Sequence, residues 1–232
     1  IRMAHTKDKV VDLETAVIRF AGDSGDGMQL TGNLFSDSTA FAGNDFATFP
    51  DYPAEIRAPQ GTVAGVSGFQ IHFGRTDIHT SGDLADVLIA MNPASLKANM
   101  KWITKEAIII VDTDAFIPKN LAKAGYETDP LSDDSLHGHL VVKAPITTLT
   151  KEAVKELHID NKSAQKSKNM FALGLVFYMF NRNYETTFKF FEQKFKANPL
   201  VVEANKKVLT AGYNFAHTIE AFANTYKIQP AP

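Results

Sequence analysis

The first two thirds of the chain alternate between short apolar runs and segments of helical period. Runs rich in branched and aromatic residues predict six strands, at residues 15–21, 45–49, 66–73, 86–91, 107–111 and 140–144. The runs at 86–91 and 107–111 are continuously apolar, as expected of parallel strands buried on both faces. Helical spacing predicts helices over residues 28–41, closed by Gly43, and 94–105. Strand and helix therefore alternate, as in βαβ units.

After Thr147 the pattern becomes helical. Helices are predicted over residues 149–158, 163–181, 184–197 and 199–226, and Pro199 separates the last two because proline breaks a continuous helix. The fold class is thus α/β, a mostly parallel sheet flanked by helices with a helical C-terminal half. Residues 1–226 are expected to form one domain, and 227–232, with two prolines, to begin a linker.

Composition narrows the functional classes. The 24 Lys and Arg against 26 Asp and Glu give a net charge of −2, which argues against nucleic-acid and polybasic membrane binders. With no cysteine, the chain has no disulfide, zinc–thiolate site, iron–sulfur ligand or cysteine nucleophile of its own. The longest apolar run, 171–180, is well short of the roughly 20 residues that span a bilayer. A soluble, cytoplasmic protein is expected.

A glycine turn, Gly22-Asp-Ser-Gly-Asp-Gly27, joins the first strand to the first helix. A helix N-terminus attracts anions, which favours a ligand here. However, the spacing matches neither a dinucleotide fold nor a P-loop, and Asp23 and Asp26 compete with phosphate for the same N–H groups. The alternative is a tight turn with glycines at positive φ and an Asp that caps the helix. Both interpretations stay open.

Metal and cofactor motifs are otherwise weak. Gly25-Asp-Gly27 resembles the start of a thiamine diphosphate signature, but that signature needs an Asn about 25 residues later, and Asp51 to Ala54 contains none. His137 and His139 have spacing suited to two metal ligands, yet a solvated polar turn explains them better. No catalytic residue and no metal ligand is predicted.

A family resemblance appears when three segments are taken together: Ile18 to Gly32, then Phe49-Pro-Asp-Tyr-Pro-Ala-Glu-Ile-Arg57, then Gly61-Thr-Val-Ala-Gly-Val-Ser67. Together they resemble the gamma domain of 2-oxoacid:ferredoxin (acceptor) oxidoreductases, and most of all the domain at the N-terminus of the alpha subunit of the 2-oxoglutarate type. The resemblance covers nearly the whole chain. It departs at Ala58-Pro59, where members commonly have two glycines.

The resemblance implies a Rossmann-like domain of a larger enzyme that decarboxylates a 2-oxoacid on thiamine diphosphate and reduces ferredoxin through iron–sulfur clusters. That larger enzyme transfers the acyl group to coenzyme A. Thiamine diphosphate, its Mg²⁺ and the clusters belong to other domains or subunits, namely a pyrimidine-binding alpha-type domain following in the same chain and a thiamine-bearing beta subunit. The gamma domain contributes to coenzyme A binding and subunit assembly, and alone it is inactive.

Carried over residue by residue, the resemblance implies a coenzyme A contact in the glycine turn at Gly22, Ser24, Gly25 and Gly27. Arg57 matches the Arg of the Glu-x-Arg motif and is a candidate anion clamp, since a guanidinium binds carboxylate or phosphate with two hydrogen bonds. A salt bridge to Glu55 or to a neighbouring chain is the slightly favoured alternative. Asn92 ends a buried strand, where open α/β sheets place ligands, although Asn-Pro also starts helices.

Two other functions are compatible with the residues. One is an assembly module with a degenerate nucleotide-binding fold and no ligand. The other is an NAD-dependent dehydrogenase domain, which is disfavoured because the turn lacks G-x-G-x-x-G and the strand at 45–49 does not end in the ribose-binding acid of that fold.

Overall fold

The computed structural model describes residues 9–55, 57–219, 222 and 224–232. Eight strands lie in this part of the chain: β1 (Lys9–Leu13), β2 (Thr15–Asp23), β3 (Asp45–Asp51), β4 (Val66–Gly74), β5 (Ala85–Ala90), β6 (Ile103–Asp112), β7 (Leu140–Ala144) and β8 (Asn224–Ile228). The α-helices described are α1 (Met28–Phe41), α2 (Pro93–Asn99), α3 (Pro118–Lys123), α4 (Ile146–Ala153), α5 (Asn161–Gln165), α6 (Lys168–Met179), α7 (Glu185–Lys194) and α8 (Pro199–Thr218).

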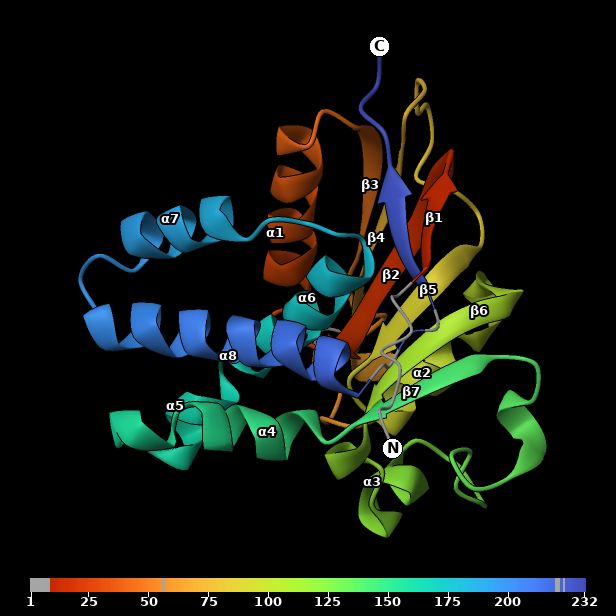
Figure 1. Cartoon of the computed structure of the whole chain (residues 1–232). Helices are drawn as coiled ribbons and strands as arrows, with labels where there is room; N and C mark the ends of the chain where they lie inside the picture. Colours follow the sequence, from red (N-terminus) through yellow and green to blue (C-terminus); the bar gives the residue numbers. More distant parts are fainter. Residues whose placement is uncertain (1–8, 56, 220–221, 223) are drawn as a thin grey trace, which may run out of the picture.

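Six strands form the central sheet in the order β3-β4-β2-β5-β6-β7 (Figure 1). The pairs β2–β5, β5–β6 and β6–β7 are parallel, whereas β4 is antiparallel to both β2 and β3. The predicted mostly parallel sheet is therefore confirmed. Because β4 separates β3 from β2, the strand order departs from that of a dinucleotide fold, in which the second strand lies beside the first.

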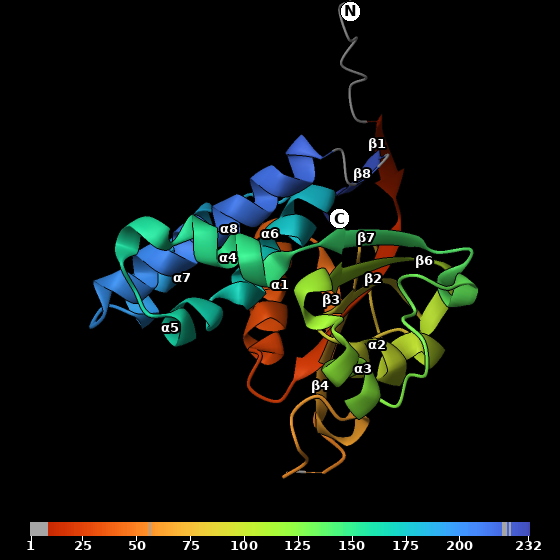
Figure 2. The same cartoon turned by 90° about the horizontal axis from the view of Figure 1, so that it is seen from below.

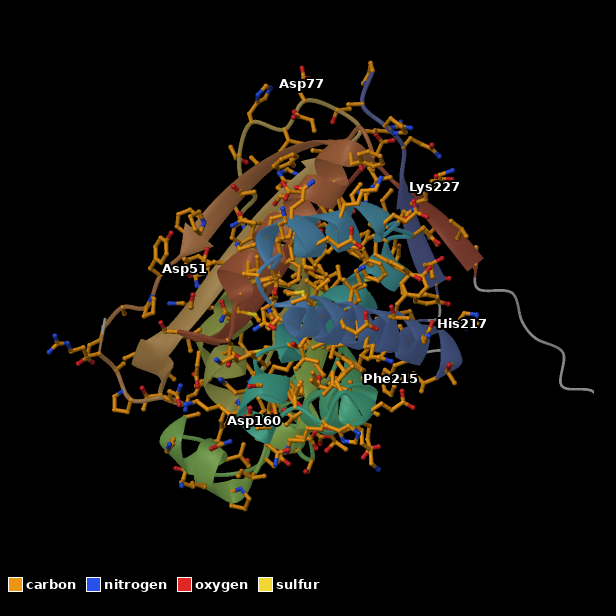
Figure 3. All side chains as sticks on the ribbon, turned by 90° about the vertical axis from the view of Figure 1, so that its left-hand side faces the viewer. Asp51, Asp77, Asp160, Phe215, His217 and Lys227 are labelled. Atoms are coloured by element: carbon orange, nitrogen blue, oxygen red, sulfur yellow. The ribbon has the colours of Figure 1, made fainter. Side chains whose placement is uncertain are left out.

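The two faces of the sheet have different covers (Figures 1 and 2). Alternate residues of β2 belong to two cores: Ile18 and Phe20 pack with α1, α6 and α8, while Val17 and Ala21 pack with Leu96 of α2. Short helices α2 and α3 make up the thin second layer. The thick layer, which faces the viewer in Figure 3, confirms the predicted helical C-terminal half.

Helix α6 is the centre of the thick layer. Its residues from Asn169 to Met179 are all buried, and it crosses α8 at two glycines. A methyl group added at Gly174 would lie 2.2 Å from the carbonyl oxygen of Leu209, and one at Gly212 would lie 2.1 Å from that of Phe171. Only glycine permits this approach of two helix backbones.

Several predicted helix boundaries were wrong. The helix predicted at 94–105 ends at Asn99 and passes through a 3₁₀ turn (Met100–Trp102) into β6, so that residues 103–105 are strand. Residues 163–181 form two helices, α5 and α6, because the α-helical hydrogen bonding is interrupted between Lys166 and Lys168. The remaining predicted helices shift by a few residues, as expected for helix ends, and α8 begins at Pro199 as predicted.

The end of the chain differs most from the sequence prediction. Helix α8 stops at Thr218 instead of residue 226, and residues 224–228 form β8, which pairs in parallel with β1. Neither β1 nor β8 was predicted. The segment expected to begin a linker therefore starts within a strand, and the backbone after it bonds to the domain, since Ala231 N–H donates to the carbonyl of Gly43 at 2.8 Å. The division into domain and linker stays a prediction.

No helix in the described ranges combines the length and the apolar character that crossing a membrane requires.

Candidate functional site

The candidate site lies where parallel strands β2 and β5 end. Helix α1 leaves β2 toward one face of the sheet, and α2 leaves β5 toward the other. Such a divergence opens a crevice at the carboxyl ends of the two strands, which is where open α/β sheets bind ligands. Met91 N–H donates to the carbonyl oxygen of Ala21 at 3.0 Å, so Gly22 and Asn92 follow side by side. We call this region the strand-end crevice.

The glycine turn makes a close bend into α1. Gly22 is buried, and a methyl group there would lie 2.9 Å from Asp26 Oδ2. Gly27 is the N-cap residue of α1 with φ of 78°, in the left-handed region that favours glycine. Gly25 also has positive φ, and Ser24 is exposed. The expected Asp cap is absent: Asp26 Oδ2 instead accepts the N–H of Asp23 at 2.9 Å, and Gly27 makes no side-chain cap.

Asn92 starts α2 and lies next to the glycine turn. Its Oδ1 accepts the N–H of Ser95 at 2.8 Å, while its own N–H donates to Ser95 Oγ at 3.1 Å, which forms a reciprocal capping box. The predicted role of Asn92 in starting a helix is therefore confirmed. Burial raises the pKa of Asp23, and the nearby Asn92 amide partly opposes that rise, although Oδ1 of Asp23 makes no hydrogen bond of normal geometry in the described structure.

Arg57 is exposed on the loop between β3 and β4. This loop is bonded to the glycine turn: Gly61 N–H donates to Asp23 Oδ2 at 3.0 Å, and Ser24 N–H donates to the Gly65 carbonyl at 3.1 Å. Arg57 forms no ion pair with a described residue, so the alternative of a salt bridge to Glu55 is wrong, while a salt bridge to a neighbouring chain stays a prediction. The structure therefore brings Gly22, Gly27 and Asn92 together and leaves Arg57 exposed on the loop bonded to that turn.

Four charged residues of the crevice, namely Asp23, Asp26, Asp112 and Lys168, were not on the predicted list. Asp112 ends β6, is fully buried, and accepts the Thr147 hydroxyl at 2.7 Å. Lys168, at the start of α6, pairs with Asp26 at 3.0 Å. Asp23 lies at the end of β2. Asp112 was predictable, because it follows the apolar run 107–111 just as Asn92 follows the run ending at Met91. The ion pair between Lys168 and Asp26 was not predictable, since 142 residues separate the partners.

Burial dominates the electrostatics of these carboxyl groups. It raises the pKa of Asp112, while the Thr147 hydrogen bonds and the charge of Lys168 act in the opposite direction. Burial, followed by repulsion from Asp26, raises the pKa of Asp23. The crevice thus has three carboxyl groups around one lysine. Such a surface repels phosphate and suits neutral hydrogen-bonding groups.

The described part of the chain contains no group of three or more His, Asp or Glu side chains arranged to hold a metal ion.

Comparison with known proteins decides the family. Residues 17–215 match the model of the pyruvate ferredoxin/flavodoxin oxidoreductase family. The chain belongs to that family. Within it, the chain is 51% identical over 219 residues to the 2-oxoglutarate oxidoreductase subunit KorA of Mycobacterium tuberculosis. The alignment covers 94% of this chain and 34% of KorA, so the chain spans about a third of the length of that relative.

Solved structures of oxidoreductases share the fold. A 2-oxoglutarate:ferredoxin oxidoreductase from Magnetococcus marinus matches with a TM-score of 0.71 at 23% identity, over 95% of this chain and 34% of that one. The gamma subunit of a keto/oxoacid ferredoxin oxidoreductase from Geobacter sulfurreducens matches with a TM-score of 0.61 at 17% identity, over 88% of this chain and 98% of that one. The second match shows that this fold also exists as a separate subunit.

Proposed function

We propose that this chain is the gamma domain of a 2-oxoglutarate:ferredoxin oxidoreductase, in which it contributes to coenzyme A binding and subunit assembly. The main support is the 51% identity to KorA across nearly the whole chain. The remaining two thirds of that relative have no counterpart here. We assign thiamine diphosphate, its Mg²⁺ and the iron–sulfur clusters to other domains or subunits: an alpha-type domain in the same polypeptide and a beta subunit, with ferredoxin as electron acceptor.

The structure of the Magnetococcus enzyme supports coenzyme A as the ligand, because it contains 2-oxoglutarate, coenzyme A and succinyl-CoA. For this chain we assign the contact with coenzyme A to the glycine turn and its neighbours. Gly22, Gly25 and Gly27 permit close backbone approach, and Ser24 offers an exposed hydroxyl. Asn92 borders the same crevice, and Arg57 supplies an exposed cation that carboxylate or phosphate can bind.

The chemical role of the domain is to bind and orient. The other domains or subunits of the proposed enzyme supply decarboxylation and electron transfer, and this chain positions the thiol substrate that accepts the acyl group. The carboxylates of the strand-end crevice repel the phosphate groups of coenzyme A. The uncharged part of coenzyme A is therefore the part that lies against the glycine turn.

Native mass spectrometry of the full-length protein from its host, with a viologen-reduction assay on the same sample, tests the assignment to the enzyme. We expect a complex with thiamine diphosphate and iron–sulfur clusters that reduces the dye with 2-oxoglutarate and coenzyme A. A lone chain without cofactors and without dye reduction would contradict the proposal and favour the assembly module.

Arg57→Ala in that complex tests the ligand contact. Loss of a charge-assisted hydrogen bond costs about 1.5 kcal/mol, so KM for coenzyme A should rise about tenfold while decarboxylation continues. Arg75→Ala is the control, because Arg75 is also exposed but pairs with Glu14, between β1 and β2. An unchanged KM in Arg57→Ala would exclude Arg57 from the site.

A further inference from the structure

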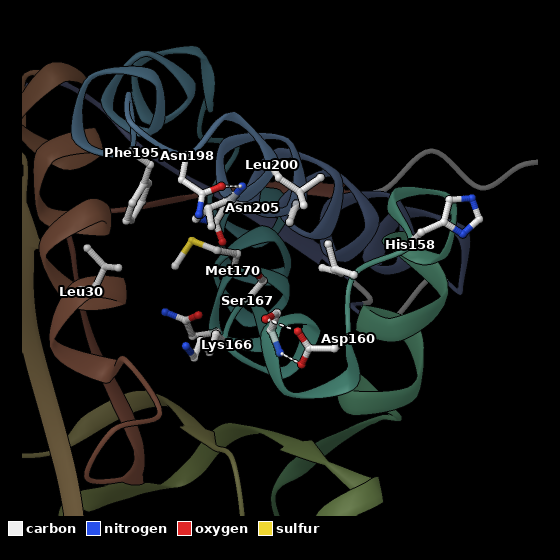
Figure 4. A pocket seen from close by; sticks show the side chains of 15 residues that line it. Leu30, His158, Asp160, Lys166, Ser167, Met170, Phe195, Asn198, Leu200 and Asn205 are labelled. Carbon is white, nitrogen blue, oxygen red and sulfur yellow. Dashed lines mark hydrogen bonds between the residues drawn. The ribbon is translucent and has the colours of Figure 1, made fainter.

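A second concave region lies on the helical side of the glycine turn. It is a groove of about 540 Å³ between α1, the segment joining α4 to α6, and the turn from α7 to α8 (Figure 4). Helices α6 and α8 also contribute, and the apolar lining side chains are Leu30, Ile159, Met170, Phe195, Leu200 and Val201. The volume lies within the range of small-molecule sites. We call it the helical groove.

An unpaired amide marks the wall of the groove. Asn205 of α8 is only 6% exposed and makes no hydrogen bond with any described residue, and Figure 4 shows its side chain among the residues that line the groove. The hydroxyl of Ser167, also buried, has no hydrogen bond in the described structure either. Neither polar group is among the buried side-chain atoms that lack a partner, so both reach the open space of the groove, where water can bond to them. A ligand in the groove with its own donor and acceptor can take the place of that water.

The interior of the groove is uncharged. Asp160, at the edge of the groove, is the N-cap residue of α5, and its carboxylate accepts hydrogen bonds from the N–H groups of Lys162 and Ser163. Lys166 is exposed and is the lysine among the lining residues. The groove therefore suits a neutral chain that has apolar groups and amides, with any anionic end outside near Lys166.

The groove shares a wall with the glycine turn. Asn169 lines the groove, and its Nδ2 donates to the carbonyl of Gly27 at 3.3 Å and to the hydroxyl of Thr31 at 3.2 Å. Leu30, on the first turn of α1, lines the groove as well. A ligand in the helical groove thus lies directly beside the turn to which the coenzyme A contact is assigned.

We propose that the helical groove binds the pantetheine arm of coenzyme A, an inference that rests on the function proposed above. The arm has two amides, a hydroxyl and a dimethyl group and is neutral, which matches Asn205, Ser167 and the apolar lining. The adenosine phosphates stay outside. Asn205 then acts as a specificity residue for the amide-bearing part of the substrate.

Calorimetric titration of the full-length enzyme with pantetheine and, separately, with adenosine 3′,5′-bisphosphate tests this assignment. Asn205→Leu should weaken pantetheine binding about tenfold and leave binding of the bisphosphate unchanged, since it removes one amide partner. Leu200→Trp should weaken pantetheine similarly by filling the mouth, where Leu200 is exposed. Asn214→Leu, an exposed change on the same helix outside the groove, is the control and should change neither.

The outcomes separate the two proposals. Equal pantetheine affinity in wild type, Asn205→Leu and Leu200→Trp, in an enzyme that still requires coenzyme A, would overturn the groove assignment alone. A wild-type enzyme that neither uses coenzyme A nor binds pantetheine would overturn both. Asn205 makes no hydrogen bond with a described residue, so unchanged thermal unfolding of Asn205→Leu should accompany the expected result.

Discussion

The strand-end crevice and the helical groove are neighbours with opposite character. The crevice collects the carboxyl groups of Asp23, Asp26 and Asp112 around Lys168, whereas the groove is lined by apolar and amide side chains. Helix α6 contributes to both regions through adjacent residues: Lys168 forms an ion pair with Asp26, and Asn169 lines the groove. Successive helical residues point about 100° apart, so one helix start separates a charged site from a neutral one.

The difference between the two regions shows how the charge of each region selects the part of a long ligand that it binds. Buried carboxyl groups disfavour phosphate at the ends of the strands, and the uncharged groove accepts amides. The charge distribution of this domain therefore orients a coenzyme that has a neutral arm and an anionic end, without help from catalytic groups.

The largest expected effect comes from the helix crossing beyond the groove. Gly174→Ala places a methyl group 2.2 Å from the backbone of Leu209, so α6 and α8 must separate and the groove must open. We expect a loss of about 3 kcal/mol or more in the free energy of unfolding, measured by urea denaturation.

Ala211→Gly on α8 is the matched control for this crossing, because it removes a methyl group whereas Gly174→Ala adds one. Helix propensity alone predicts a loss of about 1 kcal/mol there. If Gly174→Ala were as stable as the wild type, the close crossing would not exist in solution.

A smaller effect is expected at the wall shared by the two regions. Gly27→Ala combines positive φ with a methyl group 2.6 Å from Asn169 Nδ2, and should cost about 2 kcal/mol. Gly25→Ala has positive φ but no neighbouring atom within 4 Å, so about 1 kcal/mol of backbone strain is expected. Equal losses in thermal unfolding would show that Asn169 does not press on the turn.

The smallest effects are in the pH dependence of stability. Burial raises the pKa of Asp112 above 3.8, so its contribution to stability is present below pH 3.8 and lost as pH rises through the raised pKa. Hydrogen bonds from Ser163 lower the pKa of Asp160, at the groove, so its contribution is present above pH 3.8 and lost as pH falls through the lowered pKa.

Asn substitutions separate these two carboxyl groups. Asp112→Asn should leave the melting temperature at pH 7 unchanged or higher, and Asp160→Asn should lower it slightly. Melting curves from pH 3 to pH 7 measure both. A fall in Asp112→Asn matching that of Asp160→Asn would mean that the ionised Asp112 is well stabilised in the fold.

The sequence predicted the parts of this molecule whose signals are local. Continuous apolar runs located β5 and β6, and the rule that ligands bind at strand ends selected Asn92. That Gly22 lies beside Asn92 was not predicted, because it depends on the pairing of β2 with β5. The short helix α3 was missed. Residues 224–226 were assigned to a helix and 227–228 to a linker, because the strand β8 gains its stability from a partner distant in sequence. The helical groove was missed for the same reason, since its walls come from residues 30 to 205.

The pairing of β1 with β8 has a consequence for how the chain folds. Lys9 pairs with Asn224 and Leu13 with Ile228, so this small sheet closes a loop of more than 200 residues. Closure of so long a loop has a large entropic cost unless the intervening chain is already compact. The two strands therefore associate late in folding, and their amide hydrogens report, by exchange with solvent, whether the rest of the domain has reached its native arrangement.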